Sequence, residues 1–406
     1  MVFKSIGSLL HRTIENKPLF SVTLGQLVRI LGRSQAWIFI PVYLSRIRDI
    51  PYVYIGLLFF LSALLSLPVS IYGGNLVDKI GRRLLIVSIP IMVSIIFLSL
   101  GLAVSFSSNI FIVFALFILI EPFASLQGIL DNVVVTDVTE EAERINAFGI
   151  VRIAGNIGFS IGPAIGGFLA YEGYEYIFFV PAALSVVESL IFFLYIKDVK
   201  IELQKDRKPF QFPSSNRPFI IISILIAMIF FVAGQWGTTL TLFWNNIYHM
   251  SNREIGILYT VNGLIVVFFQ VPVSTLFRKI KDYVSITIGG LIYSLSFLAM
   301  GISSSFLFLI FDVILLTMAE NIVSPVSMSL VSKFAPSDKR GQYFGAYQLI
   351  QGFISPLAPL YGTFLLGFLF FTPLGFWSFI AIPGIVISLF VLRFGSRKER
   401  GTISKP

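Results

Sequence analysis

The chain has 406 residues, of which 56% are hydrophobic and 13% are charged, against roughly 45–50% and about 25% in soluble domains, and this composition indicates a membrane protein. Cysteine is absent and the only histidines are His11 and His249, so disulfides and metal centres are not expected. No cofactor is expected either. The net charge of +9 is typical of Lys and Arg residues that flank apolar spans, and nucleic acid is not an expected partner.

Apolar runs long enough to cross a lipid bilayer, about 20 residues each, follow one another along the whole chain. They predict an all-α membrane protein with twelve transmembrane helices, near 20–44, 53–73, 84–105, 109–132, 145–170, 176–196, 218–245, 254–276, 284–303, 306–331, 342–368 and 374–394. The last two, which share the Phe-rich stretch 364–394, are the hardest to separate. An even number of spans places both termini on one side of the membrane.

The distribution of the 30 Lys and Arg residues predicts which side that is. Most of them fall in the termini and in the loops on the same side, whereas Arg29, Arg33 and Arg152 lie within predicted spans. Because cytosolic loops are rich in Lys and Arg, we expect a multi-pass protein of the cell membrane with both termini in the cytosol.

A polar stretch between the sixth and seventh spans divides the chain into two halves. It predicts an N-terminal six-helix bundle over 1–197, a cytosolic linker over 198–217 and a C-terminal six-helix bundle over 218–406. At an offset of 196, Arg144, Phe148 and Gly149 recur as Arg340, Phe344 and Gly345. At an offset of 204, Pro68-Val69-Ser70 recurs as Pro272-Val273-Ser274. The halves are therefore predicted to be pseudo-symmetric copies of one unit.

The loop after the second span, GGNLVDKIGRR at 73–83, carries four charges between two apolar runs. With twelve spans in two halves, it resembles the major facilitator superfamily of secondary transporters, whose loop signature is met by Gly74, Asp78, Lys79, Gly81, Arg82 and Arg83. The resemblance implies that Asp78 engages the start of span eleven, near Gly341, and that the arginine pairs with Asp137. It also implies that these residues form a conformational latch, which favours the state closed toward the cytosol.

The fifth span contains GIVRIAGNIGFSIGPAIGG, with glycines spaced four residues apart. It matches the family motif associated with exporters and antiporters at Gly149, Gly158, Gly162, Pro163, Gly166 and Gly167. Glycines 158, 162 and 166 share one helix face and allow another helix to approach closely, with span eight as the expected partner. The alternative is that these small residues only pack helices, as they do in most membrane proteins, and packing by itself indicates no direction of transport.

Ionisable and polar side chains inside the spans are costly and are therefore candidates for proton or substrate sites. They are Gln26, Arg29 and Arg33 in span one, Glu121 in span four, Arg152 in span five, Gln235 and Trp236 in span seven, and Glu320 and Asn321 in span ten. Glu121 and Glu320 are candidate proton sites. The arginines either control the proton affinity of these carboxylates or anchor an anionic substrate. A fixed Arg–Glu brace is the structural alternative. Glu188, in span six, has no assigned role.

Together these features predict a secondary transporter, with no enzymatic activity, that exports small organic molecules in exchange for protons by alternating access. The expected partners are the lipid bilayer, a small-molecule substrate and protons, and we expect a monomer. Two alternatives stay open: an uptake permease for an organic anion or other small metabolite, and a membrane sensor or scaffold without transport.

Overall fold

The computed structural model describes residues 13–140, 143–196, 212–336, 339–369 and 372–399. Within these residues all regular elements are helices, as predicted. Eleven stretches are long and apolar enough to cross a membrane. The remaining predicted span, 20–44, is the long helix α2, whose interior carries Arg29 and Arg33.

The first half of the chain contributes α2 (Lys17–Arg46), α3 (Tyr52–Ile80), α4 (Arg82–Ser105), α5 (Ile110–Ile118), α6 (Ile120–Asp137), α7 (Arg144–Glu172) and α8 (Tyr176–Tyr195). The second half contributes α9 (Arg217–Ala233), η1 (Gly234–Trp236), α10 (Thr238–Asn246), α11 (Asn252–Phe277), α12 (Asp282–Met300), α13 (Phe306–Phe334), α14 (Arg340–Ile354), α15 (Leu357–Leu369) and α16 (Pro373–Glu399). The predicted linker lies largely outside the described residues.

Three predicted spans are interrupted. The fourth breaks at Leu119, with Pro122 in the first turn of α6, and the seventh passes through the short 3-10 turn Gly234–Trp236. The eleventh breaks before Pro356, whose ring nitrogen has no hydrogen to donate. These breaks set the orientations of the segments that carry Glu121 and Gln235.

The internal repeat is visible at the beginnings of α2 and α9. Asn16 caps α2 by accepting from Leu19 N at 3.2 Å, and Asn216 caps α9 by accepting from Phe219 N at 3.1 Å. In both cases a proline follows in the first turn, where a missing N–H costs nothing. The amide of Asn16 also donates to Val138 O, just beyond α6, at 2.8 Å.

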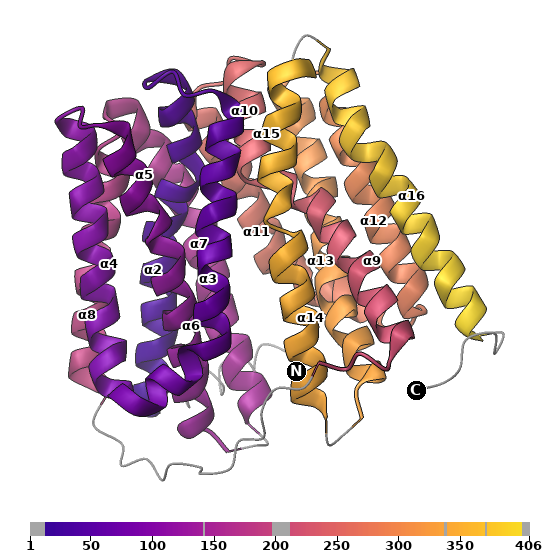
Figure 1. Cartoon of the computed structure of the whole chain (residues 1–406), viewed down its shortest axis with the longest axis horizontal. Coiled ribbons are helices and arrows are strands. Elements are labelled where there is room, and N and C mark those ends of the chain that lie inside the picture. The colour runs from indigo at the N-terminus through magenta and orange to yellow at the C-terminus, as the bar shows by residue number, and fades with distance from the viewer. Residues whose placement is uncertain (1–12, 141–142, 197–211, 337–338, 370–371, 400–406) are drawn as a thin grey trace. The chain divides into compact units, whose positions relative to one another are not determined.

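Contacts divide the chain into two compact units. The first comprises Met1–Arg48, Leu61–Lys205 and Ser251–Gly263, and the second comprises Asp49–Phe60, Asp206–Met250 and Leu264–Pro406. In the first unit α2 packs along α7 and α8, and α4 packs along α8 and α6 (Figure 1). In the second, α12 packs along α16 and α13, and α9 contacts α14 and α16.

Candidate functional site

The first unit holds ionisable side chains inside its helix bundle. Arg29 of α2 forms ion pairs with two carboxylates, Asp131 of α6 and Glu188 of α8, the latter at 2.6 Å between Nη1 and Oε1. Arg29 also donates to Gln26 Oε1, and Asp131 Oδ1 accepts from Gln127 Nε2 at 3.2 Å. The side chain of Glu188 is 2% exposed and that of Arg29 is 12% exposed. The guanidinium of Arg29 thus joins α2 to α6 and α8. We call Arg29, Asp131 and Glu188 the Arg29 cluster.

Two glycines let Arg29 reach α8. Gly25 and Gly32 lie one turn before and one turn after Arg29 on the same face of α2. A Cβ built on Gly25 would lie 2.6 Å from the Phe192 ring, and one built on Gly32 would lie 3.2 Å from the Cα of Pro181. Side chains at either glycine would push α8 away, so the glycines are what allow the Arg29–Glu188 contact.

Two serine hydroxyls fix α8 against α4. Ser189 Oγ, next to Glu188 in the chain, donates to Val87 O at 2.7 Å. Ser94 Oγ of α4 donates to Ala182 O of α8 at 2.8 Å. Because these bonds join one helix to the backbone of the other, they hold the rotation of α8 that directs Glu188 into the bundle.

A second ion pair lies one turn further along α2. Arg33 pairs with Glu121, in the first turn of α6 just after the helix break at Leu119. Both side chains are 27% exposed, so this pair is more accessible than the Arg29 cluster. The sequence suggested these two residues as a proton site or a brace, and the structure places them in direct contact.

A cavity of about 400 Å³, counting the space open to its surroundings, adjoins both groups of charges. Its polar lining comes from Arg29, Arg33, Gln127, Ser185 and Glu188. Apolar residues of α2, α4, α6 and α8 complete it: Val28, Ile89, Pro90, Val93, Phe97, Ile120, Ala124, Pro181 and Leu184. Its lining residues follow α2 from Val28 toward its C-terminal end and α8 from Glu188 back toward its N-terminal end. The cavity therefore lies on the side of the Arg29 cluster that faces away from the start of α2.

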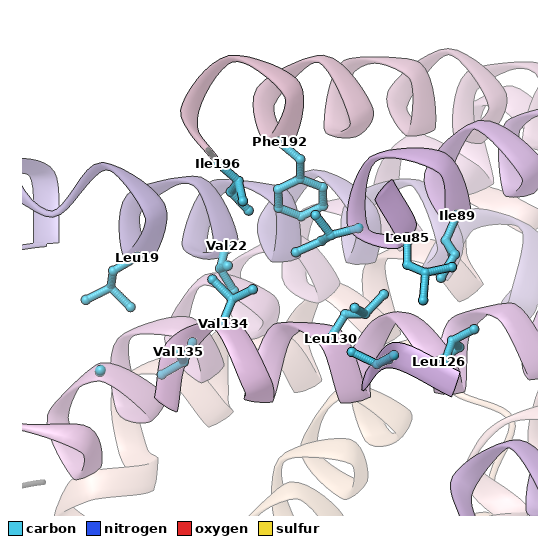
Figure 2. Close-up of a cluster of buried hydrophobic side chains, with 13 residues drawn as sticks. Leu19, Val22, Leu85, Ile89, Leu126, Leu130, Val134, Val135, Phe192 and Ile196 are labelled. Atoms are coloured by element: carbon cyan, nitrogen blue, oxygen red, sulfur yellow. The ribbon is translucent and has the colours of Figure 1, made fainter. Parts of the chain in front are cut away.

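On the other side of the Arg29 cluster the bundle is filled by apolar side chains. Val22 of α2, Leu130 and Val134 of α6 and Phe192 of α8 belong to a buried hydrophobic core that fills the space between these helices (Figure 2). Phe192 lies one turn beyond Glu188, toward the end of α8. The cluster thus has a cavity with polar lining residues on one side and mainly apolar packing on the other.

The glycine face of the fifth span packs against α2, not against span eight as predicted. A Cβ built on Gly158 would lie 2.5 Å from Leu27 O, and one built on Gly162 would lie 2.6 Å from Leu31 O. A Cβ built on Gly166 would lie 2.9 Å from the Cα of Gln35. The backbones of α7 and α2 therefore touch along three helical turns.

Span eight, the helix α11, contacts the neighbouring face of α7. There the glycines that make room belong mainly to α11: a Cβ on Gly256 would lie 2.5 Å from Pro163 O, and Gly263 faces Ser160. Gly167 of α7 faces the backbone of Asn252. Because α7 has glycines on two faces, the spacing of 158, 162 and 166 alone did not identify the partner.

The motif at 73–83, expected as a loop, is mostly helical: residues 73–80 end α3, Gly81 is the turn and Arg82 begins α4. Arg82, which begins α4, forms an ion pair with Asp137, which ends α6, and this is the contact that the resemblance implied. The side chain of Asp78 lies outside the described residues, so its engagement with the start of span eleven stays a prediction. Gly81 has a φ of 105°, a conformation that favours glycine, and it forms the turn between α3 and α4.

In the second unit, the candidates of span seven lie at the break between α9 and α10. Gln235 is fully buried, donates to Ala358 O of α15 at 3.0 Å and accepts from Thr239 Oγ1 at 2.8 Å. Trp236 packs edge to face with Trp244, with ring centroids 6.0 Å apart. Gln235 therefore ties α15 to the break, which is a structural contact.

The candidates of span ten lie on α13. Glu320 is half-buried and Asn321 is fully buried, and neither polar side-chain atom of Asn321 has a hydrogen-bond partner among the described residues. Asp312 is 1% exposed and lies near Ser296 and Tyr248. The polar groups of α13 are thus spread along the helix and do not form a cluster like that of Arg29.

Sequence reasoning placed two ionisable residues differently. Arg152, a candidate proton or substrate residue of span five, is exposed on α7 and lies outside the Arg29 cluster. Glu188, which had no role, is a member of the Arg29 cluster. The signal that could have found it is the pair of glycines that flank Arg29, because a charge between two small residues indicates a helix in close contact at that depth.

Long apolar helices, an internal repeat and ion pairs within the spans define a multi-pass membrane protein of the secondary-transporter class. The chain belongs to the Major Facilitator Superfamily, whose family model matches residues 22–359 and 245–404. It is therefore a membrane transporter and not an enzyme.

Several relatives resemble the chain over most of its length. It is 25% identical to the uncharacterized MFS-type transporter YttB of Bacillus subtilis (strain 168), covering 91% of both chains. It is 26% identical to a Na(+), Li(+), K(+)/H(+) antiporter of Planococcus maritimus, covering 82% of this chain and 86% of the relative. It is 26% identical to the quinolone resistance protein NorA of Staphylococcus aureus (strain MRSA252), covering 69% and 72%.

A solved structure of the nucleoside transporter NupG superimposes with a TM-score of 0.77 at 12% identity, covering 93% of this chain and 99% of that chain. At this identity the likeness establishes the fold alone.

Proposed function

We propose that this transporter exports small organic molecules in exchange for protons, by alternating access between bundles 1–197 and 218–406 joined by the linker 198–217. It works as a monomer in the cell membrane, with both termini in the cytosol, where most of its Lys and Arg residues then lie.

The observation that carries the proposal is the Arg33–Glu121 pair at the cavity of the first unit. A proton-coupled carrier needs a carboxylate within the membrane that gains and loses a proton during each cycle. An arginine that approaches or leaves such a carboxylate changes its proton affinity. Glu121 has this partner and is exposed enough to exchange a proton.

The direction of transport is supported by the α7 motif and by two relatives. The motif of Gly149, Gly158, Gly162, Pro163, Gly166 and Gly167 is the one that the family associates with exporters and antiporters. The names of the Planococcus antiporter and of NorA point to proton exchange and to drug resistance. Both favour export over uptake.

The charge balance of the first unit favours cationic or neutral substrates. Arg29 and Arg33 contact three carboxylates, namely Asp131, Glu188 and Glu121. An uptake permease for an organic anion is the second candidate, because two arginines lie in one helix. Both guanidinium groups are already engaged by carboxylates, which weakens that alternative.

The conformational latch of Gly74, Asp78, Lys79, Gly81, Arg82, Arg83 and Asp137 belongs to the same proposal. Rocking of the bundles separates Asp78 from the start of span eleven, whereas Arg82 and Asp137 hold the helix ends together within bundle 1–197. The strength of the Asp78 contact then sets the balance of the two states. Asp78→Asn is expected to slow transport and to shift that balance while leaving membrane insertion intact. Unchanged transport would remove the latch from the mechanism.

Proteoliposomes that contain a pH-sensitive dye test the function directly. Lipophilic cations, neutral drugs and organic anions are added in turn to wild type, Glu121→Gln, Glu320→Gln and the control Glu172→Gln, an exposed residue at the end of α7. We expect cations to drive proton movement in wild type and control but not in Glu121→Gln. Substrate flux without proton movement in the wild type would overturn the proposal, and a response confined to anions would favour the second candidate.

A further inference from the structure

We propose that Glu188 is a proton-binding residue, which exchanges its proton through the cavity of the first unit, while Arg29 and Asp131 set the charge balance around it. The inference rests on the proposed function and deepens it, because it names a group that carries the coupled proton. Glu188 lies on α8, and the sequence had assigned it no role.

The charge count of the Arg29 cluster is the first argument. One guanidinium contacts two carboxylates, which lie on membrane-spanning stretches, and all three side chains are nearly buried. A buried negative charge without a compensating cation is costly in such surroundings. One proton makes the cluster neutral, so the cluster is built to hold one.

Hydrogen bonding identifies which carboxylate takes that proton. Both oxygens of Asp131 accept hydrogen bonds, Oδ1 from Gln127 and Oδ2 from Arg29. Glu188 accepts only at Oε1, from Arg29 at 2.6 Å, and its second oxygen has no hydrogen-bond partner among the residues that the structure describes. Donors stabilise a carboxylate in its ionised form, so Glu188, which has fewer donors, is the one that takes up the proton.

The surroundings of Glu188 give the proton one route. Glu188 lines the cavity, beside Gln127, whose Oε1 is buried and has no partner in the described structure. Past Glu188, apolar side chains that include Val22 and Phe192 fill the space between α2, α6 and α8, and the amide oxygen of Gln26 there is engaged by Arg29. Exchange therefore runs through the cavity.

The other charged groups near Glu188 are accounted for helix by helix. Arg29 and Arg33 come from α2 and Asp131 and Glu121 from α6, whereas the cavity residues of α4 are apolar and Arg152 of α7 is exposed. A structural brace needs only one carboxylate for Arg29. A metal cation would need about six oxygen ligands, whereas here two oxygens remain without a hydrogen bond, on Gln127 and Glu188.

Infrared titration of the protein in lipid vesicles tests proton binding independently of transport. We expect the wild type and Glu172→Gln to show the carbonyl band of a protonated carboxylic acid that titrates with pH, and Glu188→Gln to lack it. In Asp131→Asn the second negative charge is gone, so the band should move to lower pH by about one unit. The conservative variant Glu188→Asp should keep a titrating band, which shows that the site folds. A band that persists in Glu188→Gln, or a wild type without one, would overturn the inference.

Flux measurements then separate this inference from the proposed function. If Glu188→Gln exchanges substrate for substrate but no longer moves protons, Glu188 carries the coupled proton. If it keeps wild-type proton movement while Glu121→Gln loses it, the inference fails and the proposed function stands. If the wild type itself moves substrate without protons, both the proposed function and the coupling role of Glu188 fail. If sodium, potassium or lithium ions abolish the infrared band at constant pH, the group that Glu188 binds is a metal cation and not a proton, and the inference fails.

Discussion

Arg82 at the beginning of α4 forms an ion pair with Asp137 at the end of α6. The corresponding helix ends of the second unit carry the same contact with the charges exchanged: Asp282 begins α12 and binds Lys333, in the last turn of α13, at 2.5 Å. Helix N-termini carry a partial positive charge and C-termini a partial negative charge. Arg82 and Asp137 therefore lie at the unfavourable ends of their own helices, whereas Asp282 and Lys333 lie at the favourable ends.

The first prediction follows from this difference. Asp137→Asn should lower the free energy of unfolding by about 1–2 kcal/mol, because Arg82, 16% exposed, loses its carboxylate at a positive helix end. Lys333→Ala should cost about 0.5 kcal/mol or less, since Lys333 is 62% exposed and Asp282 keeps its favourable position. Unfolding in detergent micelles measures both losses, and equal losses would contradict the dipole argument.

The second prediction concerns the glycines of α7. Gly162→Ala should destabilise the protein by about 1–3 kcal/mol, because the new methyl group meets Leu31 O and Ser34 of α2. Gly149→Ala is the matched control in the same helix and motif, since a Cβ there meets nothing within 4 Å. Thermal unfolding of the two purified variants tests the difference. Tolerance of both would show that α7 and α2 are not held at backbone contact.

The third prediction concerns the charges at the cavity. Glu121→Gln removes a negative charge beside Arg33 and should weaken binding of a lipophilic cation by about tenfold, whereas Arg33→Gln should strengthen it by a similar factor. Equilibrium binding of a fluorescent cation to each variant in vesicles measures both. Changes in the same direction would mean that the pair acts through structure and not through charge.

The fourth prediction concerns Tyr248, in the loop between α10 and α11, which donates to Met300 O at 2.5 Å. Burial, followed by the charge of Asp312, raises the pKa of Tyr248 to about 12 from its ordinary value of about 10. Because the folded state binds this proton more tightly, its stabilising contribution is full below pH of about 10 and is lost as the pH rises toward about 12.

Asp312→Asn removes the negative charge and should lower the pKa of Tyr248 toward its ordinary value. Ultraviolet titration of tyrosinate, taken as the difference from Tyr248→Phe in each background, isolates this residue. Tyr248→Phe should also flatten the loss of stability above pH of about 10. An unchanged titration in Asp312→Asn would leave burial as the cause of the shift.

Much of the fold could be predicted from the sequence because helix formation in a bilayer depends on local composition. Runs of about 20 apolar residues located eleven of the twelve predicted spans among the described residues, and the twelfth, α2 with its two arginines, is a long helix that is less apolar. The repeat at an offset near 200 residues also appears in the structure, in the caps Asn16 and Asn216. The breaks at Leu119 and at Gly234–Trp236 were missed, since the apolar pattern continues across both.

The candidate site was predicted less completely. Periodicity along one helix placed Arg29 and Arg33 on one face of α2, and it placed Gly158, Gly162 and Gly166 on one face of α7. It did not show that the glycine face packs on α2 or that Arg29 binds Asp131 and Glu188.

The sequence by itself thus determined where most of the spans lie and the helix faces that carry charges and small residues, because these depend on neighbours three or four positions away. Only the tertiary structure decided which faces meet. Arg29, Asp131 and Glu188 come from helices far apart in the chain, and their contact depends on the depth, rotation and spacing of those helices. Gly25 and Gly32 bring α8 close enough, and the hydroxyl bonds of Ser94 and Ser189 fix its rotation against α4, so the cluster is a property of packed helices that no single helix contains.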